Sequence, residues 1–283
     1  VAGYALNRAE ALRDGTLLKF EDVTNDRSPA YRSDCHISQV EVVHQECRFG
    51  APAVRPEVVL FGDPPAAHFF NPAEAAAKDT NPAFLRRRQS GCPAVLGPIW
   101  NGKFKRQYTE CDTWKQVVLK EIAERKPKLV ILSSATQQAM MAPGAAAAAP
   151  EEERPALYRI ALARMITEIL KSAERVALIT DTPRLPEEPL LCLARNPKNE
   201  EACRWPLATL STGMRYVPDL SGFGDRVLVA DVSSQICPGG VCYATVGGRV
   251  VFYDQSHFTA TFSLNLTDQF KRVFAFADVG TRE

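Results

Sequence analysis

Hydrophobic runs of strand length recur along the chain and alternate with segments of helical periodicity. The four clearest runs are VVLFGD (58–63), KLVILSS (128–134), RVALITD (175–181) and RVLVADV (226–232). Apolar positions recur at helical spacing in AEAAAK (73–78), TWKQVVLKEIAERK (113–126) and ALYRIALARMITEILKSAE (156–174). Strands that are buried on both faces are continuously apolar, so this alternation predicts βαβ units and an α/β fold with a parallel sheet between two helical layers.

Other segments give weaker signals. SQVEVV (38–43) alternates as a short edge strand would, whereas FLRRRQ (84–89) is a poor strand candidate because it holds three consecutive arginines. Residues 1–34 are polar and mixed, with a helical pattern around residues 8–13, and we predict a lead-in or linker segment there. No internal repeat or convincing boundary follows, so residues 35–283 are predicted to form one domain.

Eight cysteines fall into four sequential neighbourhoods, Cys35 with Cys47, Cys92 with Cys111, Cys192 with Cys203, and Cys237 with Cys242. Their number does not fix the connectivity, but four local disulfides and an oxidising compartment are the favoured interpretation. The alternative is eight buried free thiols in a cytosolic protein. Zinc sites have short paired spacings that this chain lacks, so we predict no metal site, and no sequence motif calls for a cofactor.

Charge and hydropathy limit the classes of partner that we expect for the chain. The 34 basic and 33 acidic residues leave a net charge of +1, which gives no electrostatic basis for a nucleic-acid partner. No apolar stretch is long enough to span a membrane, and the opening residues lack the pattern of a signal peptide.

Ligands of open parallel sheets bind beyond the carboxyl ends of the strands. This rule selects four candidate segments, Asp63 to His68, Ser133 to Gln137, Asp181 to Pro183, and Asp231 to Gln235. Ser133 and Ser134 are placed to donate hydrogen bonds to a ligand, or alternatively to cap the next helix. In SGCP (90–93), Gly91 permits close approach of the backbone to a ligand, although a disulfide-anchored loop explains the same residues.

Asp254 and His257 form the sharpest chemical pattern, in FYDQSHFTATF (252–262). Three residues apart, they can point into one site, where a carboxylate fixes the imidazole tautomer and stabilises the imidazolium. The alternative is that Asp254 caps a helix and His257 is an ordinary surface histidine.

The junction LFGDPPAAHFF (60–70) is where a hydrolase of this general architecture presents a nucleophile and backbone N–H groups. Here Pro64 and Pro65 follow Asp63, and proline has neither a nucleophilic side chain nor an amide N–H. Proline suits the first turn of a helix, so a purely structural strand-to-helix junction is the alternative.

Together these segments resemble the SGNH hydrolase-like domain that is fused to bacterial acyltransferase-three membrane proteins, which O-acylate cell-surface sugars. The resemblance runs in order from Cys35 to Phe262. VVLFGD is similar to the family's VVLxGDSHA block, YTECDTWKQVVL (108–119) to its Y-x-x-C-x-x-W helix start, and YDQSHFTATF to its DxxHLT block. SGCP and KLVILSSA resemble the second and third blocks.

The resemblance implies a flavodoxin-like three-layer α/β/α fold and an extracytoplasmic location beside a membrane-embedded acyltransferase domain. It also implies an acyl donor and a glycan acceptor as partners. Asp254 and His257 fall on the family's acid and base, Gly91 on its oxyanion-hole glycine, and Pro64 on its nucleophilic serine. Asp63, Ser133 and Ser134 remain candidates for oxyanion or substrate binding, although the asparagine of the third block is absent.

Two functions of different classes follow. The chain is an acyltransferase partner domain that Pro64 deprives of covalent turnover, because such a catalytic unit fails when one member is missing. Alternatively it is a non-catalytic carbohydrate-binding or docking module. Candidate aromatic residues for sugar stacking are Phe69, Phe70, Trp100, Tyr108 and Trp114, although a place in the core is the favoured interpretation for most of them. A plain secreted esterase is a third interpretation, which Pro64 disfavours.

Overall fold

A six-stranded, mostly parallel sheet forms the centre of the computed structural model, which describes residues 10–13, 16–29, 37–43, 45–50, 57–80 and 83–278. Its strand order is β11-β9-β8-β4-β5-β3, and only the edge strand β3 is antiparallel to its neighbour. The four apolar runs form β4 (Val58–Gly62), β8 (Leu129–Ser133), β9 (Arg175–Ile179) and β11 (Val227–Ala230). The predicted α/β fold is therefore confirmed.

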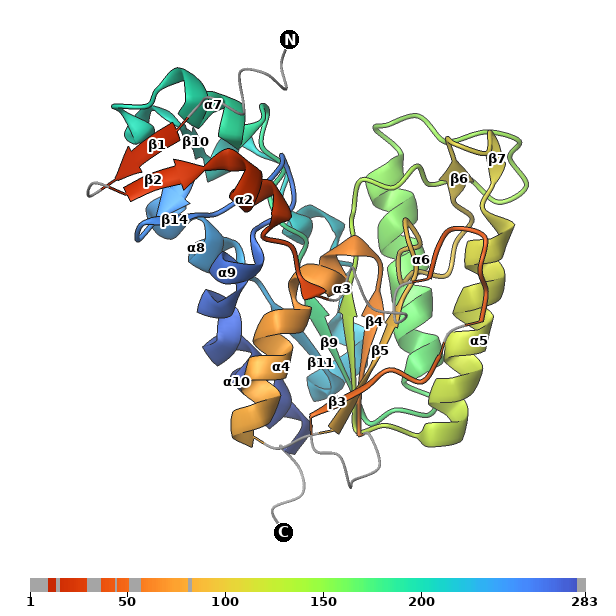
Figure 1. Cartoon of the computed structure of the whole chain (residues 1–283). Helices are drawn as coiled ribbons and strands as arrows, with labels where there is room; N and C mark the ends of the chain where they lie inside the picture. Colours follow the sequence, from red (N-terminus) through yellow and green to blue (C-terminus); the bar gives the residue numbers. More distant parts are fainter. Residues whose placement is uncertain are drawn as a thin grey trace.

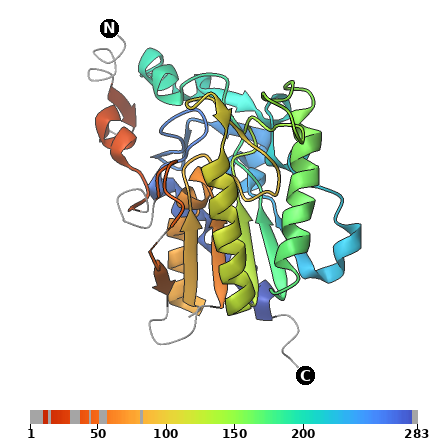
Figure 2. The same ribbon diagram turned by 90° about the vertical axis from the view of Figure 1, so that its right-hand side faces the viewer.

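Helices cover both faces of the sheet (Figure 1). On one face lie α4 (Phe70–Thr80) and α10 (Thr267–Asp278), and on the other lie α5 (Thr109–Arg125) and α6 (Arg154–Ile169). Figure 2 shows α5 and α6 running side by side across their face. Successive residues of β4 point to opposite sides, so Leu60 joins one hydrophobic core whereas Val59 and Phe61 join the other.

The arginine-rich segment that looked unfavourable forms β5 (Ala83–Arg88), a strand whose side chains are all buried. The Arg87 guanidinium makes two hydrogen bonds of 2.5 Å to the carboxylate of Glu121 on α5. Arg86 lies 4.7 Å above the ring of Phe70. Buried arginines are tolerated when a carboxylate or an aromatic face replaces water. The expected strand at SQVEVV is wrong, since residues 38–43 form no strand and the edge position belongs to β3 (Arg48–Gly50).

Three local disulfides join the cysteine pairs predicted from their spacing, Cys92–Cys111, Cys192–Cys203 and Cys237–Cys242. The fourth predicted pair involves Cys35, which lies outside the described residues. Cys192–Cys203 and Cys237–Cys242 lie in a small lobe, which is drawn above the sheet in Figure 1. Its elements are α7 (Pro189–Arg195), β10 (Arg204–Pro206), α8 (Ser233–Ile236), β12 (Val241–Tyr243), β13 (Thr245–Val246) and β14 (Arg249–Val250).

The described part of the lead-in segment contains a hairpin, β1 (Glu10–Arg13) with β2 (Thr16–Lys19), and then α2 (Phe20–Asn25). The helical pattern expected around residues 8–13 is therefore wrong over residues 10–13. Asp26 accepts a backbone N–H bond from Ala260, and Ser28 donates to Asn71, so the end of this segment packs on the domain. The division of the chain at residue 34 stays a prediction.

Short elements complete the fold. They are α3 (Pro64–His68), β6 (Trp100–Asn101), β7 (Arg106–Gln107) and α9 (Ala260–Ser263). Within the described residues, no helix has the length and apolar character needed to cross a membrane.

Candidate active site

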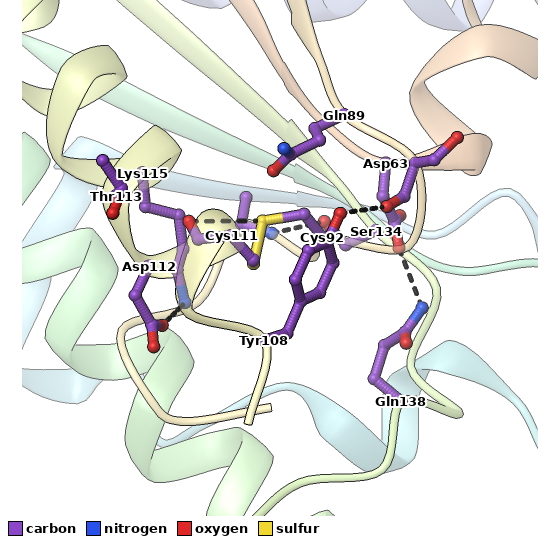
Figure 3. The surroundings of a disulfide bond; sticks show 12 residues. Asp63, Gln89, Cys92, Tyr108, Cys111, Asp112, Thr113, Lys115, Ser134 and Gln138 are labelled. Carbon is purple, nitrogen blue, oxygen red and sulfur yellow. Dashed lines mark hydrogen bonds and ion pairs between the residues drawn. A yellow bond between two sulfur atoms is a disulfide. The ribbon is translucent and has the colours of Figure 1, made fainter. Parts of the chain in front are cut away.

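The carboxyl end of β4 forms the centre of the candidate site. A side chain at Gly62 would place its Cβ 1.8 Å from the carbonyl oxygen of Ser133, so only glycine lets β4 and β8 approach this closely. Asp63 follows and is fully buried. Its carboxylate accepts hydrogen bonds from the Ala135 N–H at 2.8 Å and from Nε2 of Gln138 at 3.0 Å. Figure 3 shows the bond to Gln138. Burial raises the pKa of Asp63 to about 8.

The two prolines after Asp63 occupy the first turn of α3. This is the place in a helix where a missing N–H costs least, because that group would have no intrahelical acceptor. Pro64 therefore fits the fold well, and it brings neither a hydroxyl nor an N–H donor to the site. This geometry fits a purely structural junction between β4 and α3. It equally fits the resemblance, in which position 64 is the place of the family's nucleophilic serine.

Asp254 and His257 form a bonded pair. Nδ1 of His257 lies 2.6 Å and 2.8 Å from the two carboxylate oxygens of Asp254. The backbone N–H groups of Ser256 and His257 also donate to Asp254 Oδ1. Partial burial on its own would raise the pKa of Asp254, but the hydrogen bond and charge of His257 together with the two N–H bonds lower it below its usual value. Asp254 is not a helix cap, because α9 begins at Ala260 and is capped by Thr259.

The loop after β4 and the Asp254–His257 pair meet in space. His68, the last residue of α3, places its ring 4.6 Å from that of His257, at an interplanar angle of 83°. Tyr253 stacks on His257 at 5.6 Å. Burial, followed by the charges of His257 and Arg88, holds the pKa of His68 well below its usual value. His68 is therefore a neutral neighbour that fixes the His257 ring beside the β4 loop.

Asp181, at the end of β9, is a buried acid of the same edge. It accepts hydrogen bonds from the Thr136 N–H and the Thr136 hydroxyl, at 2.8 Å and 3.0 Å. Burial raises its pKa, although these bonds and the charge of His257 act in the opposite direction. The neighbouring Thr182 donates its hydroxyl to the Ser256 carbonyl at 2.7 Å, which ties β9 to the Asp254–His257 loop. Sequence analysis selected this strand end but did not name Asp181 as a site residue.

Gly91 lies in the turn that follows β5, with φ of +61°. The Tyr108 hydroxyl donates to the Ser90 carbonyl at 2.9 Å, and the Cys92–Cys111 bridge fastens the turn to α5. Figure 3 shows this disulfide and Tyr108 beside Asp63. The disulfide-anchored loop is thus present, and the oxyanion role of Gly91 stays a prediction.

Ser133, the last residue of β8, and Ser134, which follows it, differ in their hydrogen bonds. The Ser134 hydroxyl accepts a hydrogen bond from the Ala94 N–H at 2.8 Å. Ser133 is 1% exposed, and its hydroxyl makes no hydrogen bond within the described residues. Both line a small cavity of about 30 Å³ together with Asp181, large enough for about two waters. Their role in ligand binding stays a prediction.

Most of the aromatic residues proposed for sugar stacking are in the core. Phe69 and Trp114 are fully buried, whereas Tyr108 is 1% and Phe70 is 4% exposed, so none of the four presents a face to a sugar. Only Trp100 is partly exposed. The described residues contain no cluster of three or more His, Cys, Asp or Glu side chains that could hold a metal ion.

Comparison with known proteins shows the family of the domain. The sequence model of the SGNH domain, described as fused to AT3 domains, matches residues 34–272. The periplasmic domain of a lipopolysaccharide acetyltransferase from Salmonella ser. Paratyphi A has a similar fold, with a TM-score of 0.58 at 13% identity over 86% of this chain and 92% of that one.

The C-terminal catalytic domain of peptidoglycan O-acetyltransferase A from Streptococcus pneumoniae gives a TM-score of 0.41 at 14% identity, over 80% of this chain and 97% of that one. No curated protein matches the sequence.

Proposed function

The chain belongs to the family of SGNH domains that are fused to AT3 domains, and we propose that it serves in the transfer of acyl groups to hydroxyls of cell-surface glycans. The partners in this proposal are a membrane-embedded acyltransferase domain, an acyl donor and a glycan acceptor. The proposed location is extracytoplasmic, which three disulfides support because such bonds persist in oxidising compartments.

One observation carries the proposal. The rings of His68 and His257 lie 4.6 Å apart, so the loop that bears position 64 and the Asp254-bound imidazole share one end of the sheet. Asp254 holds Nδ1 of His257, which assigns the proton to that nitrogen and leaves Nε2 as the basic atom. A serine nucleophile at position 64 would need this tautomer, together with an Nε2 atom that faces its hydroxyl.

With serine at position 64, the chemistry has two balanced steps. Nε2 of His257 removes the hydroxyl proton while the serine oxygen attacks the acyl carbonyl, and N–H donors near Gly91 hold the oxyanion. The leaving group departs with the proton from His257. A sugar hydroxyl then gives its proton to His257 and attacks the acyl carbonyl. His257 returns this proton to the serine oxygen as the serine–acyl bond breaks, so that serine is regenerated and the acyl group is transferred.

In this chain the attacking atom of that scheme is missing. Pro64 has no hydroxyl to acylate, and its ring nitrogen cannot donate to an oxyanion. We therefore propose that the domain as it stands is impaired in covalent acyl transfer, while it keeps the acid–base pair and its neighbours.

The first prediction concerns restoration of the nucleophile. The double substitution Pro64→Ser, Pro65→His should produce measurable hydrolysis of p-nitrophenyl acetate, whereas the unchanged chain should show negligible turnover. Absorbance of released p-nitrophenol measures both. Pro206→Ser, an exposed proline of β10, is the matched control and should remain inactive.

Adding His257→Ala to the restored variant should remove the gained activity, because the serine then lacks its base. Equal activity of the restored and unchanged proteins would contradict the assignment of position 64. Activity that survives His257→Ala would contradict the role of the pair.

A second candidate function is a non-catalytic carbohydrate-binding module. Pro64 and the adjoining cleft, which measures about 870 Å³, favour it. A binding module differs from an acyltransferase in the result expected for Pro64→Ser, Pro65→His. It would bind oligosaccharide, and the double substitution would leave it without esterase activity.

A further inference from the structure

A cleft of about 870 Å³ opens on the carboxyl edge of the sheet beside the candidate site. Two glutamines in its lining connect it to the acid–base residues. Gln138 donates to the buried carboxylate of Asp63 at 3.0 Å. Gln255 lies two residues before His257 in the loop that Asp254 organises. A molecule in this cleft therefore lies next to the edge of the sheet where His257 contacts His68 of α3.

Three arginines, Arg154, Arg184 and Arg215, also line the cleft. No ion pair neutralises them within the described part of the chain. Nη2 of Arg184 donates to Oε1 of Gln255 at 2.9 Å, so this guanidinium is oriented toward the Asp254–His257 loop. Nε of Arg154 donates to the Ala149 carbonyl at 2.9 Å. Each guanidinium keeps further N–H groups for a ligand, because the group carries five.

Arg154 is held by its hydrogen bond to the Ala149 carbonyl, although it stands where a cation is otherwise disfavoured. It is the first residue of α6, where the partial positive charge of the helix dipole disfavours a cation. Glu151 and Glu152 also line the cleft, and they lie before the first turn of α6. The lining therefore carries three basic and two acidic side chains, with an excess of positive charge.

The charge balance around Arg184 includes one more carboxylate. Glu188 lies close enough for Arg184 to lower its pKa, although burial and the charge of Asp254 raise the pKa of Glu188 overall. Arg184 thus lines the cleft and also contacts the loop of Asp254 through Gln255. An anionic ligand in the cleft is attracted by Arg184 and repelled by the carboxylate of Asp254. These two forces give the ligand a preferred orientation.

We propose that this cleft binds the acceptor glycan and selects acceptors that carry an anionic group, either a sugar carboxylate or a phosphate. The guanidinium fork matches both anions with two parallel hydrogen bonds. The amides of Gln138 and Gln255 suit neutral sugar hydroxyls, because an amide donates and accepts. The identification of the ligand as an acceptor rests on the proposed function, whereas the anion selectivity of the cleft stands on its own residues.

The second prediction tests this selectivity by isothermal titration calorimetry on the unchanged protein. Trigalacturonate supplies carboxylates, a phosphorylated galactotriose supplies phosphate, and neutral galactotriose is the reference. We expect at least one anionic trisaccharide to bind, and the neutral one to bind about tenfold more weakly or not at all. The stronger of the two anionic probes identifies the preferred group.

Arg184→Gln and Arg215→Gln should each weaken the anionic trisaccharide by about tenfold while galactotriose is unaffected. Arg164→Gln is the matched control, because Arg164 is exposed on α6 and does not line the cleft. Equal affinity for charged and neutral trisaccharides, or loss of binding in the Arg164 variant alone, would overturn the proposal.

The two proposals fail separately. If the Pro64→Ser, Pro65→His protein binds anions through its arginines but has no esterase activity, the result supports the anion site and contradicts the acyl-transfer function. Esterase activity without binding of any anionic trisaccharide keeps the acyl-transfer function and removes the anion site.

Discussion

Asp63 shows how a single side chain makes the site sensitive to pH. Its carboxyl group is fully buried at the end of β4, where desolvation disfavours the ionised form and raises the pKa to about 8. In the unfolded chain the same group has an ordinary pKa near 3.8. Between these two values the folded protein binds one proton more than the unfolded chain at this residue. The contribution of Asp63 to the free energy of unfolding therefore falls as the pH rises between these two values.

The third prediction uses Asp63→Asn, which keeps the size of the side chain and removes its ionisation. The unchanged protein should lose stability relative to this variant between about pH 5 and pH 7, by at most about 1.4 kcal/mol per pH unit. The free energy of unfolding from urea titrations at pH 5, 6 and 7 measures the difference. Asp181 has a raised pKa as well, so only the difference between the two proteins isolates Asp63. Parallel pH dependence in both proteins would contradict the raised pKa.

Residue patterns predicted the chemistry of the site better than its surroundings. Asp254 and His257 were identifiable because their types and spacing carry the chemistry themselves, and they form the expected bond. Sequence did not decide whether Phe69 and Trp114 stack on sugars or lie in the core, where the structure buries them, because an apolar aromatic looks the same in sequence in both places. Asp181 was missed as an individual residue because its environment comes from Thr136, far away in the chain.

At the scale of elements, the contact between β4 and β8 fixes the geometry of the site. Both strands end at the carboxyl edge, and the Ser133 carbonyl occupies the space in which a Gly62 side chain would stand. Because both backbones are held in the sheet, neither can retreat without breaking ladder hydrogen bonds.

The fourth prediction follows from this contact. Gly62→Ala should destabilise the protein by more than about 4 kcal/mol or prevent folding, because its Cβ would overlap a backbone atom. Gly102→Ala is the matched control, since nothing lies within 4 Å of a Cβ at that position. Thermal unfolding followed by circular dichroism compares the two variants. Similar melting temperatures would show that β4 and β8 are not in this close register.

Element prediction failed where distant partners decide the outcome. The four apolar strands were predictable because a continuous apolar run carries its own reason to be buried. The strand β5 was not, because its buried arginines depend on partners such as Glu121 and Phe70, which belong to helices elsewhere in the chain. SQVEVV shows the opposite case. Ile37 just before it forms a single bridge with Gln89 after β5, but the weak alternation of residues 38–43 does not extend this bridge into a strand.

For the whole molecule, the disulfides set the conditions under which the fold is stable. The lobe that carries Cys192–Cys203 and Cys237–Cys242 has short strands and little regular structure, so its bridges restrict the unfolded chain where packing contributes less.

The fifth prediction is that the folded, purified protein has no titratable thiol, even after denaturation without reductant. Reaction with Ellman's reagent in guanidinium chloride measures this directly. Reduction should then lower the stability by several kcal/mol, since bridges of this kind contribute about 2 to 4 kcal/mol each. A finding of eight reactive thiols would contradict both the disulfides and the extracytoplasmic location.

The separations of the bridged cysteines are 19, 11 and 5 residues, and no described bridge encloses another. A chain with this arrangement can oxidise each pair as soon as its second cysteine emerges from an export channel, before any later cysteine is present to compete. Threading order alone then selects the correct partners, and maturation needs oxidant but little reshuffling of wrongly joined sulfurs.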